Sequence, residues 1–250
     1  MEGRIRTVPL DIRLQIGYCD KAINNKETAY ETETAYNTHT LHACYGGYIV
    51  QAIIANLAPL FFVVFQTAFD VSFEQIGRLI LLTFGTQLVV DLLSVKFVDK
   101  IGYRAALVLA HICSVAGLVM LGTLPRLLPD PYTGLTLSVI VYAVGGGLIE
   151  VLISPIVEAC PTDNKASVMS LLHSFYCWGS VGVILLSTLF LQLFGKGSWT
   201  VLALLWALLP LVNALWFTKV PIAHLTEEGE GLPLGADHRE GIELLQQGRT

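Results

Sequence analysis

The sequence of 250 residues contains little charge. Asp, Glu, Lys and Arg make up 14% of it, hydrophobic residues make up 54%, and the mean hydropathy is +0.62. Soluble domains carry roughly a quarter charged residues, so the composition excludes that class. The sequence also has no cluster of basic residues, which argues against nucleic acid as a partner.

Cysteine is sparse and shows neither metal-binding nor disulfide spacing. We interpret Cys19, Cys44, Cys113, Cys160 and Cys177 as packing residues, and we expect no metal and no cofactor. A cleaved signal peptide is not expected either, because the first apolar run begins near residue 41, too deep in the chain, and is too long.

Long apolar runs dominate the rest of the sequence. A membrane-spanning helix needs about 20 mostly apolar residues. Five runs contain no Asp, Glu, Lys or Arg, namely 35–69, 105–125, 131–149, 166–195 and 197–218, and a sixth run, 79–97, is interrupted by Asp91. We therefore predict an all-α polytopic membrane protein with six transmembrane helices near 43–68, 79–97, 105–123, 134–157, 167–193 and 199–218.

Lysine and arginine are distributed unequally between the two ends of these helices. With the N-terminus inside, three of the 15 basic residues lie in outer loops, namely Arg78, Arg126 and Lys196, and the other twelve lie on the cytoplasmic side. Basic residues of membrane proteins favour the cytoplasmic side. We expect a multi-pass protein of the cell membrane with both termini in the cytoplasm.

Composition divides the chain into three parts. Residues 1–40 are polar and mixed in charge, and we predict a poorly ordered cytoplasmic N-terminal tail. Residues 41–220 form the six-helix bundle, in contact with the lipid bilayer. Residues 221–250 are rich in glycine and low in hydrophobicity, which favours a flexible cytoplasmic segment.

Glu150 is the foremost functional candidate, because ionisable groups at membrane depth are costly. It follows three glycines in the fourth predicted helix, and Tyr142, Gly146, Glu150 and Ser154 form one polar stripe at i, i+4 spacing. A carboxyl group in such a place can exchange a proton near neutral pH. The alternative is a protonated Glu150 that only bonds a neighbouring helix.

The second predicted helix has a matching stripe of Thr83, Gln87, Asp91 and Ser94. We expect Gln87 to contact solute and Asp91 to assist proton coupling. Asp91 is only eight residues, or about 12 Å, from Asp99 at the cytoplasmic turn. A purely structural Asp91, solvated from inside, is the open alternative.

The fifth and first predicted helices supply the other candidate solute contacts. His173, Tyr176 and Trp178 combine aromatic rings with hydrogen-bonding groups, which suits a sugar or another polar solute, and packing is the alternative for each. Asn56 lies near Pro59, which should kink the first helix. We interpret His111 as a packing residue outside the site.

The segment SVKFVDKIGYRAAL resembles the signature of the major facilitator superfamily in the loop between its second and third helices. Asp99, Lys100, Gly102 and Arg104 match that signature, and its leading Gly falls on Val95. The resemblance implies that these residues help to gate the alternating states. Physically, Gly102 allows a tight reversal, and we expect Arg104 to pair with Glu158.

Within that family, GGGLIEVLISPIV resembles the fourth helix of fucose-permease-like proton symporters, with Glu150 at the matching position. ANLAPLFFVVFQTAF is similar to the first helix of that group, whose acidic residue falls on Pro59 here. The fifth helix lacks the Gly-Pro ending of the antiporter signature, which favours symport. The family has twelve helices in two halves, each of two inverted three-helix repeats, so the chain resembles an N-terminal half.

These observations predict alternating-access transport of a small polar organic solute, with a sugar as the specific candidate, by proton-coupled symport. The expected partners are the solute, protons and a second six-helix half, as a missing segment, a separate chain or a second copy. The alternative is a non-transporting half-length subunit. An enzyme using Glu150 and His173 is not expected, because neither an HExxH pair nor a Gly-x-Ser-x-Gly elbow occurs.

Overall fold

The computed structural model describes residues 38–160, 162, 164–220 and 222, with the side chains of Val95 and Asp99 outside that description. Within these residues, six helices are long and apolar enough to cross a membrane, which confirms the predicted spans. Most of the predicted segments 1–40 and 221–250 lies outside the described residues. The elements are the N-terminal helix Thr38–Leu60, α2 Phe62–Phe69, α3 Phe73–Ile101, α4 Tyr103–Leu127, α5 Pro131–Ala159, α6 Lys165–Phe194, the short helix η1 Lys196–Ser198 and α7 Trp199–Lys219.

The first predicted span is broken where Pro59 occurs. Proline has no N–H to donate and its ring crowds the preceding turn. The N-terminal helix ends at Leu60, Phe61 has a backbone conformation of φ −86° and ψ 0°, and α2 resumes at Phe62. The predicted kink is therefore present, two residues after the proline.

Local signals set the other helix boundaries. Ser72 and Gln75 form a reciprocal capping box at the start of α3, and Asp130 and Asn164 accept backbone hydrogen bonds at the starts of α5 and α6. Gly102 joins α3 to α4 alone, at φ 81°, a value that favours glycine. The expected reversal is thus a single residue rather than a loop.

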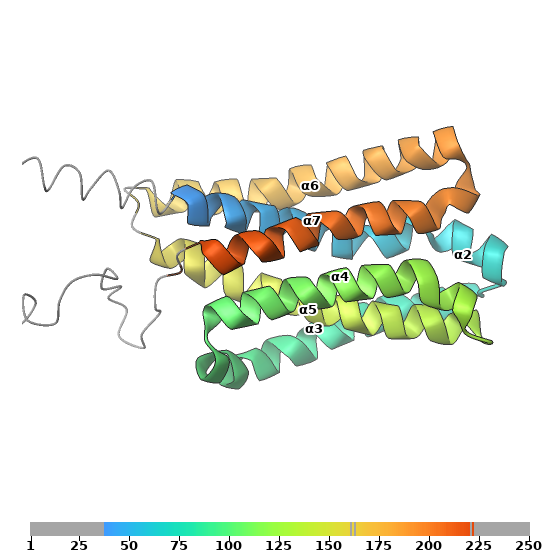
Figure 1. The fold of residues 1–250 in the computed structure, drawn as a ribbon, viewed down its shortest axis with the longest axis horizontal. Coiled ribbons are helices and arrows are strands. Elements are labelled where there is room, and N and C mark those ends of the chain that lie inside the picture. The colour runs from blue at the N-terminus through green and yellow to red at the C-terminus, as the bar shows by residue number, and fades with distance from the viewer. Residues whose placement is uncertain (1–37, 161, 163, 221, 223–250) are drawn as a thin grey trace, which may run out of the picture.

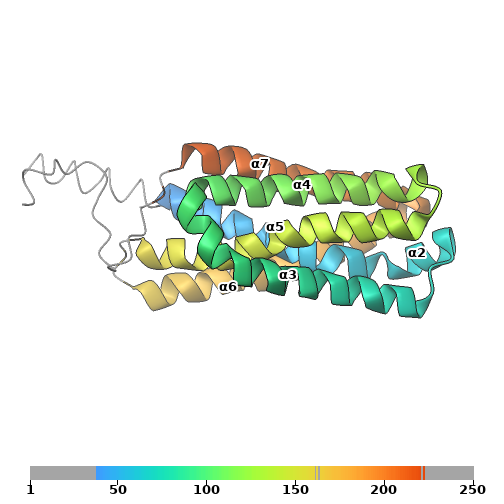
Figure 2. The ribbon, with the colours of Figure 1, turned by 90° about the horizontal axis from the view of Figure 1, so that it is seen from below.

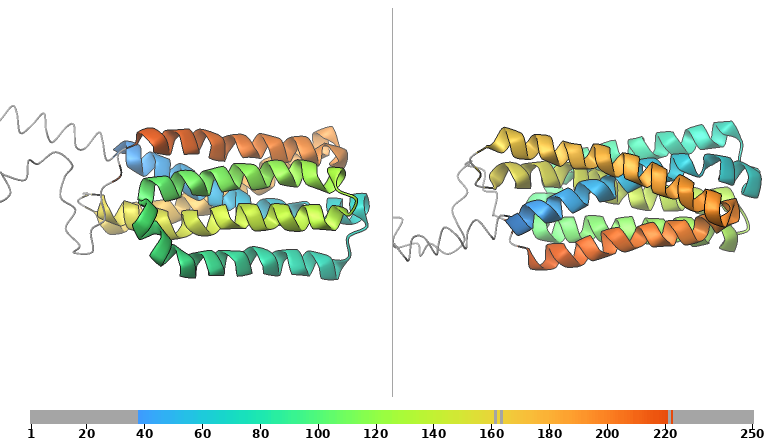
Figure 3. Two further views of the ribbon diagram at one scale, coloured as in Figure 1. Left: turned by 60° about the horizontal axis from the view of Figure 1, so that its bottom comes forward. Right: turned by 90° about the horizontal axis from the view of Figure 1, so that it is seen from above.

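The six spans form two groups of three (Figure 1). One group holds α3, α4 and α5, and the other holds the N-terminal helix, α6 and α7, with α4 packed against α7 where the groups meet. In each group one helix lies between two others: α5 between α3 and α4, and the N-terminal helix between α6 and α7 (Figures 2 and 3). Each spatial group therefore mixes helices from the first three spans and the last three, which are the two consecutive three-helix repeats predicted from the sequence.

Three consecutive glycines let α5 approach three neighbours at once. A Cβ atom on Gly145 would lie 2.5 Å from the carbonyl oxygen of Ala110 in α4, and one on Gly147 would lie 3.2 Å from Cα of Gln87 in α3. A Cβ on Gly146 would meet side chains of the N-terminal helix and α3, Gln51 and Gln87. Successive residues point about 100° apart on a helix, so each glycine serves a different contact.

An aromatic cluster closes the opposite end of the bundle from Gly102. Phe61, Phe65 and Phe69 surround Trp199 in edge-to-face geometry, with ring centroids 5.5–5.9 Å from the indole, and Arg126 lies over that ring. Such pairs are stabilising beyond the area that they bury. The cluster fixes α2 to α7 and leaves the polar middle of the bundle to be organised by α5.

The glycine contacts predict a sharp difference between two alanine substitutions. Gly145→Ala should lower the free energy of unfolding by about 1–3 kcal/mol, because the new methyl group meets backbone atoms of α4 that cannot move alone. Gly85→Ala in α3 is the matched control, since nothing lies within 4 Å of the added atom. Thermal denaturation of the purified protein in detergent measures both, and equal stability of the two variants would contradict this packing.

Candidate functional site

The two polar stripes predicted on α3 and α5 face each other in register. Tyr142 lies beside Thr83, Gly146 lies against the amide of Gln87, and Glu150 lies near Asp91, a group of like charge. Each pair is one helical turn, about 6 Å, from the next. Residues predicted separately on two helices thus form one ladder of polar pairs.

Gln51 of the N-terminal helix contacts the same group of polar residues from a third helix. Its Nε2 atom donates to Oε2 of Glu150 at 3.2 Å. Because the amide nitrogen faces the carboxylate, the amide oxygen points away from it, toward Gly146. That oxygen is buried in a side chain only 6% exposed, and it has no hydrogen-bonding partner among the described residues.

Glu150 lies deep along α5 but is exposed at the surface of the bundle. It is nine residues, or about 14 Å, before the end of the helix at Ala159. Asp91 is half-buried, and its Oδ1 atom also has no hydrogen-bonding partner among the described residues. Both carboxyl groups therefore lie within membrane spans, and that of Glu150 is accessible at the surface of the bundle.

Tyr48 connects this region to α6. Its hydroxyl is 2.7 Å from Oγ of Ser154, and its ring makes edge contacts with the rings of His173 and Tyr176 at 5.5 and 6.5 Å. His173 is exposed and Tyr176 is half-buried. We call Tyr48, Gln51, Gln87, Asp91, Glu150, Ser154, His173 and Tyr176 the central cluster.

Two predicted solute contacts are not part of the central cluster. Trp178 is five residues after His173 and so points about 140° away from it around α6, where 74% of its side chain is exposed. Asn56 is likewise five residues after Gln51, and its Nδ2 atom donates to Ala52 O and to Oγ of Ser180. Asn56 therefore holds the N-terminal helix to α6.

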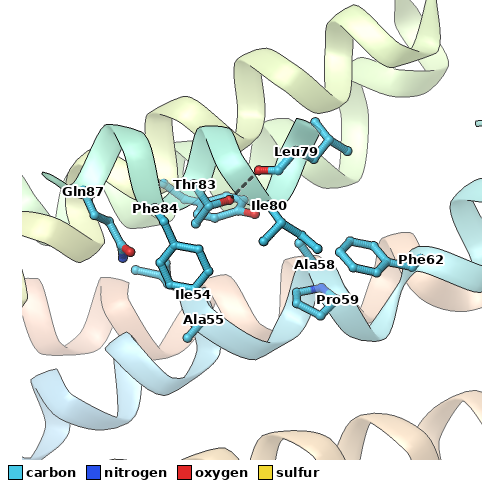
Figure 4. Close-up of a pocket in the computed structure, with 11 residues that line it drawn as sticks. Ile54, Ala55, Ala58, Pro59, Phe62, Leu79, Ile80, Thr83, Phe84 and Gln87 are labelled. Atoms are coloured by element: carbon cyan, nitrogen blue, oxygen red, sulfur yellow. Dashed lines mark hydrogen bonds between the residues drawn. The ribbon is translucent and has the colours of Figure 1, made fainter. Parts of the chain in front are cut away.

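An apolar pocket opens beside the cluster, between the N-terminal helix and α3 (Figure 4). Gln87 lies at one end with its amide directed toward the N-terminal helix, and Pro59 and Phe62 lie at the other end. The remaining lining residues are Ile54, Ala55, Ala58, Leu79, Ile80, Thr83, Phe84 and Tyr142. The space enclosed for water-sized spheres is about 30 Å³.

The predicted gating residues lie at the junction of α3 and α4. Lys100 is in the last turn of α3, Gly102 forms the junction, and the side chain of Asp99 lies outside the described residues. Arg104 does not pair with the exposed Glu158; instead its guanidinium donates to the carbonyl oxygens of Phe217 and Thr218 at 3.2 and 3.0 Å. It thereby caps the end of α7, whose last carbonyls lack helical partners.

His111 is a structural residue, as the sequence suggested. Its Nδ1 atom is 2.8 Å from the carbonyl of Leu107, which can only accept, so Nδ1 carries the hydrogen and Nε2 accepts from the amide of Asn213 at 2.9 Å. Asn213 also donates to Ala43 O at 3.2 Å. This buried pair joins α4, α7 and the N-terminal helix.

Sequence reasoning missed Gln51, Tyr48 and Asn213. A signal for the first two was present, because a glutamine and a tyrosine three residues apart lie in an otherwise apolar helix segment. Asn213 is a lone amide in an apolar helix, with nothing nearby to indicate its partner. Among the described residues, no group of three His, Cys, Asp or Glu is placed to hold a metal ion.

Comparison with known proteins agrees with this architecture. The sequence model of the Major Facilitator Superfamily matches residues 44–239. The structure resembles the crystal structure of a POT family transporter in complex with a thioalcohol conjugated peptide, with a TM-score of 0.52 and 18% sequence identity. The match covers 87% of this chain and 44% of that chain, so this chain spans less than half the length of that relative. Identity this low shows a shared fold alone, and no curated protein matches by sequence.

The His111–Asn213 pair predicts a loss of stability from a near-isosteric change. Asn213→Leu removes the donor to His111 Nε2 and to Ala43 O, and a buried polar group left unbonded costs about 1–3 kcal/mol. Gln192→Leu, on an exposed part of α6, is the control for exchanging an amide for leucine. Unfolding in detergent measures both variants, and an unchanged midpoint for Asn213→Leu would show that the pair is not structural.

Proposed function

Because the chain belongs to the major facilitator superfamily, we propose that it forms the first six-helix half of a transporter for a small polar organic solute. The family consists of membrane transporters, which agrees with the expectation that the chain is not an enzyme. The observation that carries the proposal is the central cluster, an accessible group of polar side chains deep within apolar helices. Such groups are costly in a membrane and mark solute pathways.

Alternating access would move this bundle against a second six-helix half, with the central cluster facing that half. The exposed position of Glu150 supports this, since a carboxyl group in the interior of the bundle could not reach solute. The chain covers 44% of its structural relative, which fits one half of a two-half protein. The second half is a separate segment or chain that completes the site.

Proton coupling is proposed to occur at Glu150, with Asp91 as its electrostatic neighbour. The hydrogen bond from Gln51 holds the ionised carboxylate, and protonation of Glu150 leaves that bond as a neutral one. Proton uptake thus raises the charge of the site by one unit, while Glu150 keeps its hydrogen bond with Gln51. A sugar, the candidate from the sequence, would bond the amides of Gln51 and Gln87.

Glu150→Gln should abolish solute accumulation driven by a pH gradient and leave solute exchange measurable, since glutamine keeps the size and hydrogen bonding but binds no proton. Uptake of radiolabelled L-fucose and a panel of sugars, peptides and amines into proteoliposomes that contain this chain with its second half provides the measurement. Glu74→Gln is the matched control, because Glu74 is an exposed residue that pairs with Arg78 outside the site. Proton-driven accumulation by Glu150→Gln at the level of the control would remove Glu150 from the mechanism.

The start of the N-terminal helix, the junction of α3 and α4 and the end of α7 lie at one end of the bundle (Figure 1). The proposed orientation places this end on the cytoplasmic side. In a variant without native cysteines, a membrane-impermeant maleimide should label Gly197→Cys in intact cells. Ala166→Cys, exposed at the other end, should react only after permeabilisation. The reverse pattern would invert the topology.

A further inference from the structure

The central cluster presents hydrogen-bond acceptors that lack donors. Oε1 of Gln51 and Oδ1 of Asp91 are both buried atoms without a hydrogen-bonding partner among the described residues. Gln51 is 94% buried, so its oxygen is costly to leave unbonded. Glu150 carries two further acceptor oxygens, of which one receives the amide hydrogen of Gln51.

The charge at this depth is of one sign. The ionisable acids of the described spans at the level of the cluster are Asp91 and Glu150, and the basic side chains lie toward the helix ends. Both ring nitrogens of His111 are already bonded, to Leu107 and Asn213. His173 is the other titratable ring nearby, and it packs beside Tyr48 on the α6 side.

The apolar pocket lies next to these acceptor atoms. Gln87 lines the pocket, and Nε2 of Gln87, Oε1 of Gln51 and Cγ2 of Ile54 all lie within 3.0 Å of the place where Gly146 lacks a Cβ atom. A water molecule needs roughly 10–15 Å³ of such space, so the 30 Å³ pocket has room for a group of two or three heavy atoms. Its walls are mostly alkyl and aromatic, with Thr83, Gln87 and Tyr142 as the polar lining residues, which suits a short alkyl group.

We propose that the solute is a small organic amine, bound as an ammonium group by Gln51, Asp91 and Glu150, with a short branched alkyl group in the pocket. An ammonium group has three donors and no acceptor, which complements a site with unbonded acceptors and two carboxyl groups. A sugar offers acceptors as well as donors and has no branched alkyl group. Two carboxyl groups also let one hold the ammonium while the other takes a proton. This inference rests on the proposed transport function.

The test compares molecules that share one carbon skeleton. Isobutylamine, isobutanol and isovalerate differ in the head group, and methylamine keeps the ammonium group without the branched alkyl group. Thermal denaturation of the purified protein, titrated with each probe, gives apparent dissociation constants. Isobutylamine should stabilise the protein and the alcohol and the acid should not. Methylamine should bind about tenfold or more weakly, given about 0.8 kcal/mol for each buried CH₂ group.

Two variants separate the head group from the pocket. Ala58→Leu, within the pocket lining, should weaken isobutylamine binding and leave methylamine binding unchanged, so retained methylamine binding shows that the variant is folded. Glu150→Gln should weaken both amines. Ala105→Leu, at an exposed position of α4 outside the lining, is the control and should bind isobutylamine as the parent protein does.

Equal stabilisation by the alcohol, the acid or L-fucose overturns the assignment of an amine, and so does a failure of isobutylamine to stabilise the protein at all. Equal binding of the two amines overturns the role of the pocket. The proteoliposome uptake panel reports on transport independently. Accumulation of a sugar without amine binding would therefore contradict this inference and leave the proposed function standing.

Discussion

The close approach of α5 to three neighbours is the constraint on which the rest of the structure depends. It is permitted by Gly145, Gly146 and Gly147, whose missing side chains are replaced by atoms of α4, the N-terminal helix and α3. In a membrane the lipid is as apolar as the helix surfaces, so helices associate through close packing and hydrogen bonds instead of water exclusion. Had these residues been larger, α3 and α5 would stand apart, and their polar stripes would face lipid without partners.

The close approach of α5 to its neighbours brings together polar side chains that would be costly to expose to lipid. Within hydrocarbon, each unbonded polar group costs several kcal/mol. The bonds from Gln51 to Glu150 and between Tyr48 and Ser154 show how the fold meets part of this cost. Among the atoms left without a partner in the described residues are Gln51 Oε1, Asp91 Oδ1 and the hydroxyl of Tyr142. At the buried pair of His111 and Asn213, by contrast, both ring nitrogens and the amide nitrogen are bonded. The unbonded acceptors beside Glu150 agree with the proposed use of this site by a ligand.

The sequence predicts the spans, the kink at Pro59, the junction at Gly102 and both polar stripes, because each depends on residues near one another in the chain. It does not predict which helices meet. The pair of Arg104 with Glu158 was wrong for this reason: the guanidinium instead reaches the carbonyls at the end of α7, more than a hundred residues away. Trp178 was grouped with His173 by closeness in sequence, although five residues separate opposite parts of a helix surface. The role of Gln51 becomes evident only from its hydrogen bond to Glu150, 99 residues later in the chain.

The spans differ in how much of their surface is exposed. In the apolar stretches of α3 and α6, 22% and 17% are buried, against 67% in the N-terminal helix and 61% in α5. The two most buried helices are therefore the ones that carry Gln51 and Glu150, and the two most exposed carry Asp91 and His173 at their margins. One side of the site is therefore fixed in the core of the bundle. The other side lies on helices with large exposed surfaces. In the proposed transporter, movement of a second half over α3 and α6 would alter access to the carboxyl groups, while the glycine contacts of α5 hold the polar residues of α3 and α5 in register.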